Sequence, residues 1–254
     1  MAVRDMLRHF EPADQYFASH IMDLFDQVDD GHGIRWTSFC DLHQADIVRK
    51  ISAAYDMYVQ EFGGWIEAER ILFLIAPQEN CRFEIPISSI LFVSYNALSH
   101  RDILGSLLGL GLKREQVGDI IQTQDGFVAF VKHPADRVVL DDLKKVGRES
   151  VTVREIDLSA VGEPIRNFKT ITGTVKSLRL DSIVSLCAGC SREKGKQLIE
   201  KEKVMINAVM KNSPAFPIPA SCTISIRGYG KFRIEFTGSM SAKGRYFITA
   251  NKYL

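Results

Sequence analysis

The sequence predicts an α+β protein made of three consecutive parts. Residues 1–69 are expected to form a helical region, because Phe17, Ile21, Leu24 and Phe25 recur at helical spacing. Residues 70–160 alternate short apolar runs with helical segments, which predicts a ferredoxin-like (RRM-like) domain. Residues 169–254 begin with two short helical segments and continue as alternating strands punctuated by Gly and Pro. A chain of 254 residues suits such a division, since single cores stop growing near this size.

The middle part predicts a ββαββαβ order. Its expected strands are RILFLIA, ISSILFVSY, VGDIIQT, FVAFVKH and SVTVREI, and its expected helices are SHRDILGSLLGLGL and PADRVVLDDLKKV. Ser99 is a suitable N-cap and Gly111 a suitable C-cap for the first helix. Omitting the first strand leaves the split-βαβ unit of ferredoxin-like domains. Residues 157–168 are expected to form a linker.

Charge is distributed unevenly along the chain, although the net charge is only +1. From Lys169 onward there are 15 Lys and Arg against 5 Asp and Glu, a net +10, whereas residues 1–168 carry −9. Because exposed charges are screened beyond about 8 Å at physiological salt, a partner would sense the local excess. This asymmetry is typical of a polyanion-binding module on a neutral-to-acidic carrier, although a solvated basic surface would have the same composition.

The apolar runs and cysteines limit the protein class. No run is long enough to span a bilayer, and the first residues do not form a signal peptide. Five cysteines, an odd number, do not indicate a disulfide framework. We therefore expect a cytoplasmic protein, monomeric, without a membrane partner.

A Cys-x-x-Cys pair, Cys187 and Cys190, raises the possibility of a metal or redox site. Zinc normally needs four ligands, but Cys222 is the only further thiol in this part and no histidine follows His133. Cys187 also completes an apolar helical stripe. The pattern favours a packing role, and we expect no metal, no cofactor and no catalytic residues.

Cations follow this pair at helical spacing. Arg192, Lys196 and Lys203 would share one face if the helix continued as far as Lys203, while Gly195 would allow a close helix approach. Ser191 is a good N-cap for this helix, and Gly189 suits a left-handed turn before it. The set could be extended by Arg179 on the preceding helix and by three residues of the RGYGKFR segment: Arg227, Lys231 and Arg233.

The segment RLDSIVSLCAGCSREKGKQLIEKEKVMIN resembles the S4 RNA-binding domain. Together with RGYGKF, DILGSLLGLGLKREQVGDI and GGWIEAERILFLIAP, it resembles the YlmH family of bacterial and plastid S4 proteins over nearly the whole chain. The resemblance implies RNA-recognition residues at Arg179, Ser191, Arg192, Lys194, Lys196 and Lys203, with the family's Asn at Asn207. Glu202 stands where the family has Gly and places an acid beside the expected RNA face.

The resemblance also implies a function. Family members are non-enzymatic RNA binders linked to ribosome-associated quality control, in which large ribosomal subunits obstructed by peptidyl-tRNA are rescued. Structured RNA (rRNA and tRNA) and the large subunit would be the partners. Two alternatives stay open: an accessory to an RNA-modifying enzyme, and a protein–protein adaptor in cell division or photosystem II assembly. Lys113 and Arg114 could form a second RNA contact, or could simply be turn residues between helix and strand.

Overall fold

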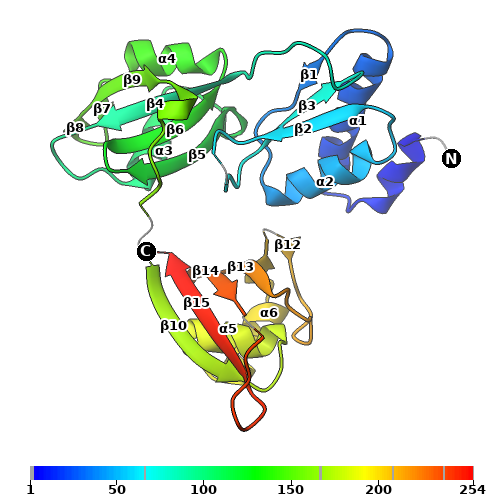
Figure 1. The fold of residues 1–254 in the computed structure, drawn as a ribbon, viewed down its shortest axis with the longest axis vertical. Coiled ribbons are helices and arrows are strands. Elements are labelled where there is room, and N and C mark those ends of the chain that lie inside the picture. The colour runs from blue at the N-terminus through cyan, green and yellow to red at the C-terminus, as the bar shows by residue number, and fades with distance from the viewer. Residues whose placement is uncertain (1–2, 66, 166–167, 208, 237, 254) are drawn as a thin grey trace. The chain divides into compact units, whose positions relative to one another are not determined.

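The computed structural model describes the chain except for residues 1–2, 66, 166–167, 208, 237 and 254. It divides into two compact units, Met1–Ile165 and Arg166–Leu254. Figure 1 shows the helices and strands of both units. Among the described residues, no helix has the length and apolarity needed to cross a membrane.

The first part of the N-terminal unit packs helices against a small sheet. It contains the 3₁₀ helix η1 (Val3–His9) and the helices α1 (Gln15–Asp29) and α2 (Leu42–Ser52). An antiparallel sheet in the order β1-β3-β2 is formed by β1 (Arg35–Trp36), β2 (Tyr58–Phe62) and β3 (Leu72–Ala76). The helical spacing of α1 is confirmed, since Ile21 and Phe25 are buried in the core that it shares with α2 and β3.

Two expectations for this part need correction. Residues 1–69 are not only helical, because they contain β1 and β2. The apolar strand Leu72–Ala76 was expected to open the middle domain, but it pairs with Arg35–Trp36 and Tyr58–Phe62. The physical reason is that all five residues of β3 are buried, so the strand needs cover on both faces and pairing at both edges. Its partners are two short, polar-rich strands that the apolar pattern did not reveal.

The second part of the N-terminal unit has the expected βαββαβ order. Its elements are β4 (Ile87–Val93), α3 (His100–Gly109), β5 (Val117–Thr123), β6 (Gly126–Lys132), α4 (Ala135–Asp142) and β9 (Thr152–Ile156). The short elements η2 (Arg114–Gln116), β7 (Lys145–Val146), β8 (Glu149–Ser150) and η3 (Leu158–Ala160) lie between or after them. The antiparallel sheet has the order β5-β6-β4-β9, as a split-βαβ unit requires. Ser99 caps α3 as expected.

The two parts of this unit meet around the GGWIEAER segment. Trp65 donates its indole N–H to the Asp119 carboxylate at 2.9 Å, and the Glu69 N–H donates to the same oxygen at 2.7 Å. Arg70 donates to the carbonyl oxygens of Val117 and Phe39, both at 2.9 Å. These bonds join the β3 side of the unit to β5, which explains why the two parts form one compact body.

The C-terminal unit packs two helices on one face of a six-stranded antiparallel sheet. Its elements are β10 (Phe168–Val175), α5 (Leu180–Ala188), α6 (Arg192–Glu200), β11 (Val204–Ile206), β12 (Val209–Met210), β13 (Ser221–Ile226), β14 (Gly230–Glu235) and β15 (Tyr246–Tyr253). The strand order is β10-β15-β14-β13-β11-β12. Figure 1 shows the first strand of the unit, β10, lying along the last, β15. The start and the end of the unit are therefore paired in the sheet.

The helix α6 ends in a Schellman motif. The Lys203 N–H donates to the Leu198 carbonyl, and the Glu202 N–H donates to the Ile199 carbonyl, at 3.0 and 2.9 Å. Glu202 occupies the left-handed position of this motif, with φ 53°. A glutamate in this conformation is strained, because its Cβ lies too close to the backbone. The conformation costs roughly 1–2 kcal/mol more than it does for glycine.

We therefore expect Glu202→Gly to stabilise the C-terminal unit by about 0.5–1 kcal/mol, since glycine relieves the strain but gains freedom in the unfolded chain. Tryptophan fluorescence would report on the other unit, because Trp36 and Trp65 both lie there. Residue-resolved hydrogen exchange of the C-terminal unit is therefore the suitable measurement. Lys201→Gly is the matched control: Lys201 has φ −87°, so glycine should only destabilise. If both variants lost protection from hydrogen exchange equally, Glu202 would not be strained in the wild-type chain.

Candidate nucleic-acid interface

The connection between α5 and α6 has the tight geometry that its sequence predicts. Gly189 ends α5 in the left-handed conformation, with φ 60°. Ser191 caps α6 by accepting a hydrogen bond from the Lys194 N–H at 3.2 Å. A Cβ at Gly195 would lie 3.0 Å from the Asp181 carbonyl oxygen, so the absence of a side chain is what lets the two helices approach closely. The first turns of α5 and α6 therefore lie side by side.

Asp181 holds two arginines at this junction. Its carboxylate accepts hydrogen bonds from Arg179 at 3.0 and 3.3 Å and from Arg192 at 3.1 and 3.2 Å. Burial alone would raise the pKa of Asp181, but the hydrogen bonds and charges of the two guanidinium groups outweigh it and lower the pKa below its ordinary value. Asp181 therefore remains ionised and orients both arginines.

The arginines remain available to a ligand. Only 4% of Asp181 is exposed, whereas the side chains of Arg179 and Arg192 are 41% and 56% exposed. Each guanidinium has five N–H donors, so donors remain after Asp181 has been bound. One carboxylate neutralises one of the two positive charges, and the cluster keeps a net positive charge beside solvent. Such a fixed pair of guanidinium groups is suited to phosphate oxygens.

Sequence analysis missed two further cations near Arg192. A hollow of about 420 Å³ is lined by Thr174, Lys176, Ser182, Ser185, Arg192 and Arg245, among others. Arg245 donates to Thr174 Oγ1 at 2.9 Å and to the Thr174 carbonyl at 2.6 Å, which fixes its guanidinium at the hollow. Lys176 is exposed. Arg245 lies far from Arg192 in sequence. The pairing of β10 with β15, in which Thr174 lies opposite Phe247, brings it to the hollow.

The expected row of cations along α6 is shorter than predicted. Lys194 and Lys196 are exposed on the helix, and the Lys196 ammonium lies 3.7 Å from the Glu200 carboxylate. The helix ends at Glu200, so Lys203 does not share its face. Lys203 instead lies next to Arg227, whose N–H donates to the Lys203 carbonyl at 2.9 Å. Both line a separate hollow of about 400 Å³ together with Glu202.

The remaining predicted cations lie on the other face of the sheet. In β14, Phe232 and Ile234 are buried in the core that α5 and α6 cover. Because side chains alternate along a strand, Lys231 and Arg233 point to the opposite face. Lys231 lies over the Tyr253 ring, 5.4 Å from its centroid, and Arg233 lies 3.3 Å from the Glu235 carboxylate. The two residues therefore do not extend the surface formed by α5 and α6.

Asn207 has a structural place in the turn after β11. Its backbone φ is 47°, and its side-chain oxygen accepts a hydrogen bond from the Thr223 N–H at 2.9 Å. The Asn207 N–H donates to the Thr223 carbonyl at the same distance. Asparagine tolerates the left-handed region better than most residues, which accounts for its presence here. The side-chain NH₂ remains as the group that could contact a ligand.

The predicted second contact, Lys113 and Arg114, consists of two exposed residues, but the Arg114 guanidinium bonds back to the backbone of its own chain. Arg114 donates to the carbonyl oxygens of Val117 and Gly118, at 2.5 and 3.4 Å. Its burial lowers the pKa to about 10, with the nearby Arg70 acting in the same direction. This place favours the alternative that the sequence left open, a turn residue between helix and strand. Lys113 is exposed.

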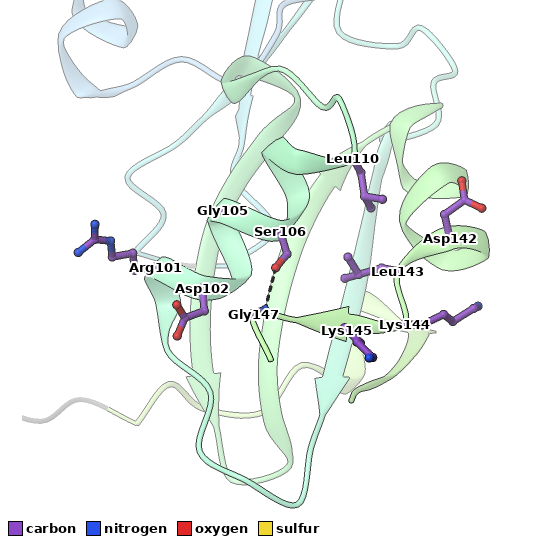
Figure 2. A pocket seen from close by; sticks show the side chains of 10 residues that line it. All are labelled: Arg101, Asp102, Gly105, Ser106, Leu110, Asp142, Leu143, Lys144, Lys145 and Gly147. Carbon is purple, nitrogen blue, oxygen red and sulfur yellow. Dashed lines mark hydrogen bonds between the residues drawn. The ribbon is translucent and has the colours of Figure 1, made fainter. Parts of the chain in front are cut away.

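The middle domain has a larger hollow of about 680 Å³ between α3 and the segment that follows α4. Its cations are Arg101, Lys144 and Lys145, and its acids are Asp102 and Asp142. Figure 2 shows Arg101 and Lys144 pointing away from each other at opposite sides, while the Gly147 N–H donates to Ser106 Oγ at 3.3 Å. The cations are therefore dispersed around the rim and do not converge on one point.

The Cys-x-x-Cys pair belongs to the packing of α5. Cys187 is buried in the core, and burial raises its pKa to about 12, with Cys222 nearby acting in the same direction. Burial likewise raises the pKa of Cys222 to about 11. A thiol with a raised pKa is a poor nucleophile and a poor metal ligand. These features favour the packing role.

Comparison with known proteins places the chain in context. Residues 77–160 match a family model described as "Putative RNA-binding domain in YlmH". The chain is 27% identical over 251 residues, 96% of this chain and 97% of the relative, to "Ribosome-associated protein quality control protein P2" from Bacillus subtilis (strain 168). The resemblance to YlmH proteins is confirmed. A solved structure, "Cell division protein ylmH from Streptococcus pneumoniae", has a TM-score of 0.55 at 23% identity, covering 61% of this chain and 98% of that chain, which indicates a shared fold.

The YlmH match lies on the ferredoxin-like middle domain, not on the unit with the basic surface. It includes β4, β9 and the hollow between α3 and β7. In this domain the sequence offered only Lys113 and Arg114 as candidate contacts. The longer similarity to the Bacillus subtilis protein extends over nearly the whole chain and includes the C-terminal unit.

The Asp181 junction predicts a pH-dependent stability. Asp181→Asn keeps the size of the side chain but removes its charge, so we expect the C-terminal unit to lose about 1–2 kcal/mol at neutral pH, a value reduced by the exposure of both arginines. Because the pKa of Asp181 is lowered in the folded state, its contribution is present above the unfolded pKa of about 3.9 and disappears as pH falls through the folded value.

Urea denaturation monitored by hydrogen exchange, from neutral pH down to about pH 3, measures this difference. The gap between wild type and Asp181→Asn should narrow as the pH falls. A gap that stays constant with pH would contradict a charge-dependent role of Asp181.

Proposed function

We propose that the chain is a non-enzymatic RNA-binding protein that acts on the ribosome in protein quality control. The observation that carries the proposal is the Arg179–Asp181–Arg192 cluster, which fixes two exposed guanidinium groups. One of them, that of Arg192, lines the same hollow as Lys176 and Arg245. The printed description of the Bacillus subtilis relative, a ribosome-associated quality control protein, supports the setting. The cytoplasm is the compartment in which such a protein would work.

The proposed ligand is structured RNA, rRNA or tRNA, on the large subunit. A-form RNA is recognised mainly through its phosphates, 2′-hydroxyl groups and shape, because its deep major groove is closed to side chains. A rigid cluster of cations positions a protein on phosphates without reading sequence. The C-terminal unit would thus act as an S4-type module, and the middle domain, which matches the putative RNA-binding family, would supply a weaker second contact.

The geometry of the Asp181 cluster decides which variants can test the RNA contact. Replacing Arg192 by an acid would place a second negative charge beside the buried Asp181 and would destabilise the fold. Lys176→Gln combined with Lys194→Gln removes two exposed cations around the cluster without disturbing it. Arg8→Gln combined with Lys50→Gln removes the same charge from exposed positions of the N-terminal unit and serves as the matched control.

Binding to purified large subunits should fall steeply with salt. If about five phosphates are engaged, log Kd against log salt should have a slope of magnitude about 3.5–4.5. Lys176→Gln/Lys194→Gln should reduce this magnitude by about 2, because each lysine accounts for one phosphate. Co-sedimentation at several salt concentrations provides the measurement.

The control variant should behave as wild type in this experiment. A flat salt response of the wild type, or equal losses in both double variants, would remove the C-terminal surface as the contact. New modified nucleosides in the rRNA after incubation with the chain would instead support the RNA-modification alternative.

A further inference from the structure

Three potential metal ligands converge at one edge of the middle domain. They are His133, which follows β6, Asp136 in the first turn of α4, and Glu155 on β9. One ligand atom from each lies within 4.8 Å of the others. None of the three belongs to the basic surface of the C-terminal unit, so the cluster is independent of the proposed RNA contact.

The sheet register explains why these residues meet. In the β4–β9 pair, Glu155 lies directly opposite Ile90, whose side chain is buried beneath the helices. Directly opposite residues point to the same face, and so does Ser88, two residues before Ile90. The helix α4 contacts both β4 and β9, which brings Asp136 over this face. The backbone N–H of His133 donates to the Pro86 carbonyl at 3.0 Å and fixes the chain before α4.

A serine connects the histidine and the aspartate. Ser88 Oγ lies 2.9 Å from His133 Nε2 and donates to Asp136 Oδ2 at 3.0 Å. His133 Nε2 and Asp136 Oδ2 are themselves 3.8 Å apart. Ser88 therefore holds the imidazole and the carboxylate side by side.

Asp136 supplies the observation that points to a missing partner. Only 8% of this residue is exposed, and among the described residues its Oδ1 has no hydrogen-bond partner. A buried carboxylate oxygen without a partner is unfavourable by about 1–3 kcal/mol or more. A protonated His133 would compensate the charge through Oδ2, but it would leave Oδ1 unsatisfied. A cation coordinated by both carboxylate oxygens would satisfy both needs, because it would compensate the charge and give Oδ1 a partner.

We propose that His133, Asp136 and Glu155 bind one divalent transition-metal ion, with Zn²⁺ as the expected ion. One imidazole nitrogen and two carboxylates form a borderline donor set that suits zinc better than Mg²⁺ or Ca²⁺, which prefer oxygen alone. The His133 side chain is 48% exposed and Glu155 is exposed, so both can shift toward an ion held at the buried Asp136. The fourth position faces solvent and would hold water.

The test is calorimetric titration of the metal-free full-length chain with ZnCl₂. His133→Gln and Glu155→Gln should each weaken one Zn²⁺ site by at least about 100-fold, the upper end of the 10–100-fold typical of losing an outer partner. Both residues are exposed, so these variants should fold. The matched control is His43→Gln, which removes another histidine paired with an aspartate, Asp14, at 2.9 Å, with 36% of the histidine exposed.

Binding by the five free cysteines must be distinguished from this site. Co²⁺ serves as the probe, because thiolate ligands produce a sulfur-to-metal charge-transfer absorption and a nitrogen–oxygen site does not. The proposal predicts a Co²⁺ spectrum without that absorption, lost in His133→Gln and retained in His43→Gln. No metal uptake by the wild-type chain, a thiolate spectrum, or equal binding by all variants would overturn the proposal.

Discussion

The proposed RNA-contact surface of the C-terminal unit depends on the ionised carboxylate of Asp181. It lies between α5 and α6, where Gly195 brings the two helices close together, and it is almost completely buried. A buried carboxylate is stable only if it is paired, and Arg179 and Arg192 supply that pairing from the starts of the two helices. The same bonds that stabilise the carboxylate hold both guanidinium groups at the surface. Stability and a preorganised cationic site therefore have one physical origin.

Cations serve a different purpose in the N-terminal unit. Arg70, Arg114 and Lys132 donate to backbone carbonyls inside the unit, and burial lowers the pKa of each. Lys132, for example, donates to the Thr37 carbonyl at 2.8 Å and so connects β6 to the segment before α2. Arg70 and Lys132 join the two parts of the unit, whereas Arg114 donates to Val117 and Gly118 within its own part. Whether a cation bonds within the fold or stays available at the surface therefore matters more for function than the number of cations in either unit.

Local patterns in the sequence predicted much of this fold, whereas long-range pairings were inaccessible. Helical spacing, the caps at Ser99 and Ser191, and the βαββαβ order depend on neighbouring residues and were confirmed. The pairing of Leu72–Ala76 with two short strands depends on distant segments and was predicted incorrectly. The three-part division of the chain remains a prediction, beside the two compact units of the structure.

The candidate site shows the same limit. Arg179, Ser191 and Arg192 meet because they flank two adjacent helices, which the sequence indicated. Lys231 and Arg233 were grouped with them by charge, but strand alternation places them on the other face. Arg245 reaches the site only through the β10–β15 pairing. Charge and spacing thus identified the helical part of the surface, while the strand contribution required the sheet register.

The proposed RNA contact lies on the surface at the starts of α5 and α6. Ultraviolet cross-linking of the full-length chain to purified large ribosomal subunits, followed by mass spectrometry of the linked peptides, locates this contact without any substitution. RNA-linked peptides are expected from residues 176–203 and around Arg245. Links confined to residues 3–165, with none in the C-terminal unit, would contradict it.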